Sequence, residues 1–147
     1  MFIIAELLEA VAIIGVLVAI SIPIFTSQLD KAKYATDLAN ARSIYAEMQA
    51  DYLVNSGTKK IKITSGEGTT EATGVTEGTA ATIKVTEENG SVNAYKFSGI
   101  VGITFTAGTS STQPSVTVAS CSKTGDAAVT FGGSAAGTTT TPAGSGS

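Results

Sequence analysis

Two patterns of apolar positions follow one another along the chain. From residue 2 to about residue 54 they recur at helical spacing, and beyond residue 57 they alternate with Thr, Ser and Lys, as in half-buried strands. A helix over the first segment is about 80 Å long, more than a small domain can cover. The sequence therefore predicts an α+β fold, with a long protruding N-terminal α-helix packed on a small antiparallel β-sheet head.

The first half of the predicted helix, residues 1–29, is apolar on all sides. From Ala10 to Phe25 only Ser21 is polar, and extending this run outward reaches the ~20 residues that span a bilayer. A helix that is apolar all round lies in lipid or is enclosed by protein. No basic segment and cleavage site of a signal peptide are visible, so we expect this half to be retained.

The second half, residues 30–54, is amphipathic. Its apolar face is spaced as a heptad seam and is expected to pack on the head; the seam consists of Tyr34, Leu38, Ala41, Tyr45, Met48 and Tyr52. The charged residues between them are expected on a solvated or subunit-facing surface; they are Asp30, Lys31, Lys33, Asp37, Arg42, Glu47 and Asp51.

Glu6 and Glu9 interrupt the apolar half, and no Lys or Arg precedes Lys31. A carboxylate within hydrocarbon costs ~2.5 kcal/mol or more and persists with a partner. The only cation within reach is an α-amino group, which a neighbouring copy displaced along the helix would bring. Glu6 is therefore expected to pair with that amine, and Glu9 lies on a similar face and can share the role. The alternative is an acid at the membrane interface, favoured by the helix dipole, and for Glu9 this alternative is the stronger interpretation.

Gly15 and Pro23 weaken the apolar half. Gly lowers helix propensity by about 1 kcal/mol relative to Ala, and Pro lacks an amide donor and clashes with the carbonyl one turn back. We expect a kink or local melting between Gly15 and Pro23 where packing demands it.

Beyond the helix, which Gly57 is expected to end, five alternating runs predict antiparallel strands. They cover residues 60–64, 81–87, 94–106, 115–120 and 127–131. Gly99 and Gly102 divide the third run into two strands or mark a bulge. Asn89-Gly90 is interpreted as a hairpin turn rather than as part of a glycosylation triplet.

Two Gly- and Thr-rich segments complete the chain. Residues 65–80 predict a long exposed loop, and residues 132–147 have too few apolar side chains to order themselves. This tail is a solvated segment or, alternatively, a glycan carrier through Thr138, Thr139, Thr140 and Thr141. The chain is thus divided into residues 1–29, 30–54, a β domain over 55–131 and the tail.

Composition narrows the function classes. The chain has no histidine and one cysteine, Cys121, so an internal disulfide and a His/Cys metal cluster are excluded and the thiol is expected to be buried. The net charge of −3 includes no basic patch, and no direct nucleic-acid site is expected. No nucleophile lies beside a base, so we expect neither enzymatic activity nor a cofactor.

The stretch "ELLEAVAIIGVLVAISIPIFTSQLDKAKYATDLANARSIYAEM" resembles the N-terminal region of type IV pilins. The resemblance is specific over about the first 35 residues, and the "IPIFTSQLDKA" continuation is similar to pilins of Gram-positive bacteria. In that family a prepilin peptidase removes a basic leader and the new N-terminal amine is methylated. The subunits wait in the cytoplasmic membrane and then assemble, with their helices bundled in the filament core.

Aligning Gly15 and Pro23 with the glycine and proline of the family makes Phe2 the methylated residue and Glu6 the usual fifth-position acid. Met1 is then one residue too many. Either the mature chain begins at Met1 and the acid stands one position late, or Met1 lies outside the mature chain. Ile3, Ala5 and Glu9 also depart from the family pattern.

The resemblance implies a major pilin that forms a helical homopolymer at the cell surface, aided by a membrane assembly platform. Adhesion, twitching motility, aggregation and DNA uptake are the roles of such filaments. Two alternatives remain at this point: a pseudopilin of a type II secretion or competence DNA-uptake system, and a single-pass membrane protein with a β ectodomain. The latter would leave Glu6 without a partner.

Overall fold

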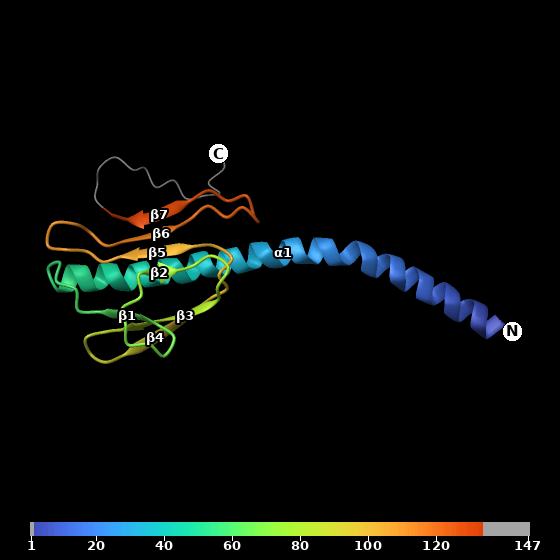
Figure 1. Cartoon of the computed structure of the whole chain (residues 1–147), viewed down its shortest axis with the longest axis horizontal. Coiled ribbons are helices and arrows are strands. Elements are labelled where there is room, and N and C mark those ends of the chain that lie inside the picture. The colour runs from blue at the N-terminus through green and yellow to red at the C-terminus, as the bar shows by residue number, and fades with distance from the viewer. Residues whose placement is uncertain (1, 134–147) are drawn as a thin grey trace.

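The computed structural model describes residues 2–133 and has an α+β architecture dominated by one helix. Helix α1 runs without interruption over Phe2–Val54, and the N-terminal half extends away from the rest of the molecule as a gently curved rod (Figure 1). Its C-terminal half packs against two antiparallel sheets. We call residues 3–29 the stem and residues 30–133 the head. The predicted fold class is confirmed.

Seven strands form the two sheets of the head. Their bounds are β1 Lys62–Ser65, β2 Gly74–Val75, β3 Ala81–Thr86, β4 Val92–Phe97, β5 Ile103–Thr106, β6 Ser115–Val118 and β7 Val129–Gly132. One sheet has the order β1-β3-β4 and the other β2-β5-β6-β7, with every pair antiparallel. In Figure 1 the two sheets lie on opposite sides of the helix axis.

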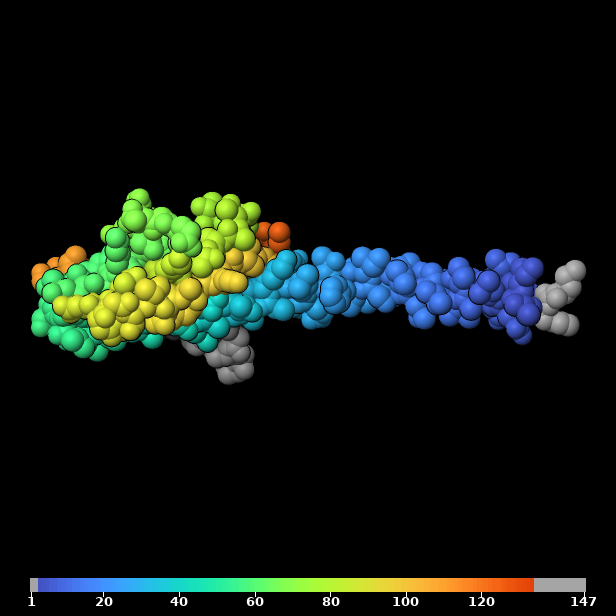
Figure 2. All heavy atoms as spheres, turned by 90° about the horizontal axis from the view of Figure 1, so that it is seen from below, coloured from blue at the N-terminus to red at the C-terminus, as the bar shows by residue number. Residues whose placement is uncertain are grey.

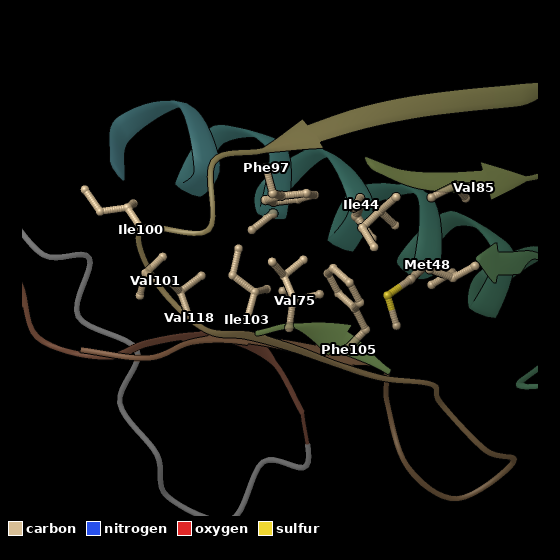
Figure 3. Packing of buried hydrophobic residues seen from close by; sticks show 14 of the residues in the cluster. Ile44, Met48, Val75, Val85, Phe97, Ile100, Val101, Ile103, Phe105 and Val118 are labelled. Carbon is tan, nitrogen blue, oxygen red and sulfur yellow. The ribbon is translucent and has the colours of Figure 1, made fainter. Parts of the chain in front are cut away.

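The hydrophobic core lies where the two sheets meet the helix. Ile44 and Met48 of α1 face Phe97 and Val85 from one sheet and Phe105 from the other (Figure 3). The rings of Phe97 and Phe105 join the two sheets, with their centroids 6.3 Å apart. Burial alternates along the strands, as expected for sheets with one solvated face.

The helix ends in a left-handed turn at the predicted position. Ser56 and Gly57 have φ values of 51° and 84°, and the Gly57 amide donates to the Tyr52 carbonyl at 3.0 Å. This bond satisfies one of the carbonyls left open at a helix C-terminus. A Cβ on Gly57 would lie 2.9 Å from the backbone of Thr109 and Ser110, so glycine is needed here both for its φ and for space.

The predicted strands are found with shifted ends, and one strand was missed. The third run does contain two strands, β4 and β5, separated at Gly99, whose φ is 75° and whose missing Cβ makes room for the Thr79 carbonyl. The segment over residues 65–80 is not wholly an exposed loop, because Gly74–Val75 pairs with β5 and Val75 is buried. A two-residue strand is too short for alternation to reveal it.

The helix seam is confirmed but is wider than predicted. Tyr34, Ala41 and Met48 are buried, whereas the other three predicted members are partly buried. Ile44 is completely buried and was missed, because the interface covers more than the heptad stripe. The prediction of a solvated or subunit-facing surface for the charged residues of this half is wrong for Asp37. Asp37 is only 1% exposed, and Glu47 is half-buried against β4.

Candidate assembly surface

The stem is an apolar surface with nothing packed on it. Every side chain from residue 3 to residue 29 is exposed, including large apolar ones such as Ile3 at 78% and Phe25 at 69% (Figure 2). The helix is long and apolar enough to cross a membrane, by length and composition, a property that N-terminal signal sequences share. Isolated exposed apolar residues are normal on proteins, but a continuous apolar rod marks a surface that contacts lipid or protein.

Glu6 and Glu9 lie on this rod, within about one turn of each other. The three ion pairs found within residues 2–133 all belong to the head: Lys59–Glu71, Lys60–Glu88 at 3.3 Å and Lys84–Glu67 at 2.9 Å. The stem acids thus have no cationic partner within the described part of their own chain. The backbone of Phe2 is helical, whereas Met1 and Thr138 to Thr141 lie outside the described residues.

The segment from Gly15 to Pro23 is helical in the single chain. Pro23 is accommodated inside α1, and a Cβ built on Gly15 would touch nothing within 4 Å. Ser21 Oγ donates to the Leu17 carbonyl at 2.7 Å, which gives this weak stretch one further local bond. Melting between Gly15 and Pro23 would therefore require neighbouring copies, and it stays a prediction.

Two carboxylates of α1, those of Asp37 and Glu47, accept hydrogen bonds from residues of the head. Asp37 accepts two hydrogen bonds from Ser98. One turn beyond Ile44, Glu47 Oε1 accepts from Asn93 and from the Tyr95 hydroxyl, both at 2.7 Å. Burial and the hydrogen bond to Glu47 raise the pKa of Tyr95 to about 12. These contacts hold β4 and the adjoining Ser98 on the helix, so the head is attached to α1 by polar contacts as well as by its core.

A groove runs beside the last turns of α1, opposite the turn between β3 and β4. Its volume is about 700 Å³, and its apolar floor comes from Ala46, Ala50, Val54 and Ile61. We call it the acidic groove because its carboxylates are Glu47, Asp51, Glu87 and Glu88. The sequence pattern did not reveal it, because the helix and the turn are brought together only by the fold. The pair of acids in "EENGS" was the one available hint.

Arg42 lies at the other border of the exposed helix face. Its guanidinium carbon is 5.4 Å from the ring centroid of Phe131, at the end of β7. Such a contact orients the cation and leaves its in-plane N–H donors available. Cys121 is 1% exposed and its thiol points to the Ile100 carbonyl at 3.7 Å, so the expectation of a buried thiol is confirmed.

Residues 2–133 contain no group of three His, Cys, Asp or Glu side chains arranged to hold a metal ion. Comparison with known proteins found no matching family model, no matching curated protein and no matching solved structure. The function must therefore be argued from the stem and the head themselves.

Proposed function

We propose that this chain is a structural subunit, a major type IV pilin, which polymerises through its stem into a filament on the cell surface. The observation that supports this proposal best is the stem itself: an uncovered apolar rod that carries two carboxylates and no basic residue. An ordinary membrane anchor gains nothing from such acids, because each one makes insertion less favourable.

The stem has two successive environments in this proposal. It first lies in the cytoplasmic membrane, where a prepilin peptidase and an assembly platform act on it, and it then moves into the core of the filament. Either environment removes its side chains from water, which contributes roughly 1.5 to 3 kcal/mol for each large apolar residue. Transfer from lipid to protein is close to neutral for these side chains, so polar contacts decide the direction.

Glu6 supplies such a contact. The carboxylate has no ion pair within residues 2–133, and the α-amino group of a second copy, displaced along the axis, provides a cation inside the apolar bundle. An ion pair in a low-dielectric environment is strong only at close range, so it also sets the register between copies. Glu9 is three residues further on and is the second acid able to receive that amine.

Electron microscopy of the purified chain tests the proposal, together with mass spectrometry of the N-terminal peptide. We expect long filaments from the wild type, and a severe loss of filaments from Glu6→Gln, which removes the charge and keeps the size. Ser21→Ala is the matched control in the stem, because Ser21 bonds only its own helix. Normal filaments from Glu6→Gln would contradict the pairing of Glu6 with the amine.

The same experiment separates the alternatives. A pseudopilin would give short assemblies, and a single-pass membrane protein with a β ectodomain would give none. The mass of the N-terminal peptide reports whether Met1 or Phe2 begins the mature chain and whether it is methylated. The filament roles consistent with the proposal are adhesion, motility, aggregation and DNA uptake.

A further inference from the structure

We infer that the acidic groove receives Arg42 of a second copy of this chain, and that this contact between heads sets the step from one subunit to the next. The inference rests on the proposed function and adds a contact between heads to the packing of the stems. Where α1 packs on the head, one face of the helix remains exposed to solvent between the two sheets.

This exposed face of α1 has a basic residue along one edge and acidic residues along the other. Four exposed alanines form its middle, which we call the alanine strip: Ala35, Ala39, Ala46 and Ala50. Arg42 lies on one border, whereas Glu47 and Asp51 lie on the other, about 140° and 180° around the helix from Arg42. Figure 2 shows the teal part of α1 uncovered beside the yellow β4. The small side chains of the strip allow another helix to approach closely.

None of the described residues that line the acidic groove is a Lys or an Arg. Glu88 pairs with Lys60, which is not part of that lining, at 3.3 Å. Within residues 2–133 the Glu87 carboxylate accepts only from the side-chain amide of Asn89, at 3.0 Å. Glu47 Oε2 is buried and has no hydrogen-bond partner within residues 2–133. An unsatisfied buried carboxylate oxygen is costly, and it leaves the negative charge of Glu47 uncompensated beside the groove.

Arg42 complements the groove in charge and in position. Within residues 2–133 the Arg42 side chain makes no hydrogen bond or ion pair, and it is held at the border of the head by the Phe131 ring. Its own chain cannot bring it to the groove, because both lie on one rigid helix. Arg42 of another copy can reach the groove, because the groove and Arg42 face nearly opposite directions around the helix.

Surfaces on opposite sides of a subunit join copies head to tail rather than as a closed dimer. Arg42 is five residues before Glu47 and nine before Asp51, so each contact displaces the next parallel copy by roughly 8 to 14 Å along α1. A displaced series does not close into a ring and grows as a helix.

The same displacement is consistent with the stem. For parallel helices, a shift of five to nine residues places Phe2 of one copy level with about residues 7 to 11 of its neighbour. Glu6 lies just below this level and Glu9 lies within it. The contact between heads and the amine pairing therefore require about the same step, although each was derived from different residues.

Charge reversal in the full-length chain tests the inference. Arg42→Glu and Glu87→Arg should each reduce sedimentable filaments about tenfold, because like charges then face each other across the contact. The double variant should restore most of the yield. Lys123→Glu and Glu77→Arg are matched controls on exposed loops and should assemble normally. Glu87 is preferred to Glu47 because Glu47 also holds Tyr95.

A second measurement does not depend on yield. Filaments carrying both Arg42→Cys and Glu87→Cys should give a ladder of covalent multimers with a short bismaleimide, while buried Cys121 stays unreactive. Either single cysteine should give no ladder. Filaments of the double-cysteine variant without a ladder, or charge reversals without effect on filament yield, would overturn the inference and leave the proposed function standing. Loss of yield from Glu87→Arg alone would assign the groove to another cationic partner, and absence of any wild-type filament would overturn the proposed function itself.

Discussion

The carboxylate of Asp37 holds both polar groups of Ser98. Its Oδ1 accepts from the Ser98 amide at 2.9 Å, and its Oδ2 accepts from the Ser98 hydroxyl at 2.7 Å. Ser98 begins the connection between β4 and β5, and these two strands belong to different sheets. One side chain of α1 thereby fastens the crossing between the two sheets to the helix.

Replacing Asp37 with Ala should therefore destabilise the head. Two donors of Ser98 lose their acceptor, and the expected decrease in the free energy of unfolding is about 2 to 4 kcal/mol. Asp37→Asn keeps the shape and an acceptor oxygen, so it should cost less. Urea unfolding of the full chain in detergent measures both values. Asp30→Ala is the control, about two helical turns before Asp37 on the same helix. Equal effects at Asp30 and Asp37 would contradict the role of Asp37.

Ile44→Ala should produce a large cavity effect. Ile44 is completely buried between the two sheets, and truncating such a side chain costs roughly 2 to 5 kcal/mol. Leu53→Ala removes a similar side chain from the same helix, but Leu53 is 68% exposed and should cost less than about 0.5 kcal/mol. Comparing the unfolding midpoints of Ile44→Ala and Leu53→Ala tests whether the core extends beyond the heptad seam.

The bond from Tyr95 to Glu47 predicts a stability change at alkaline pH. The folded-state pKa of Tyr95 is about 12, above the ordinary value of 10.0. The phenol therefore stabilises the fold fully below pH 10, and this contribution is lost as the pH rises from 10 to 12. The difference in Tm between wild type and Tyr95→Phe should shrink over that range. A difference that stays constant would show that the phenol does not titrate in this way.

Hydrogen exchange tests melting of the stem. In the detergent-solubilised chain the amides between Gly15 and Pro23 should be protected, because α1 is continuous there. In filaments the same peptide should exchange faster than the peptides on either side of it. Packing against neighbouring stems can there replace the helical hydrogen bonds that this weak segment gives up on melting. Full protection in filaments, or a filament map with unbroken helical hydrogen bonding, would rule out melting.

Much of the architecture could be predicted because it follows from local periodicity. The helix from Phe2 to Val54, its stop near Gly57 and the division of the third run at Gly99 were all expected. The contacts between α1 and the two sheets were harder to predict. Asp37 has the charge typical of a surface residue, and only the position of Ser98 makes its burial favourable.

By itself the sequence determined the long helix, its apolar and amphipathic halves, the acids of the stem and the antiparallel character of the head. These features depend on the spacing of residues within one segment, and spacing is what a sequence records. Only the tertiary structure decided that Asp37 lies inside, that Gly74–Val75 is a strand, and that an acidic groove lies opposite Arg42 on the surface of α1. Each of these depends on contacts between segments far apart in the chain, where burial and hydrogen bonding outweigh local preference.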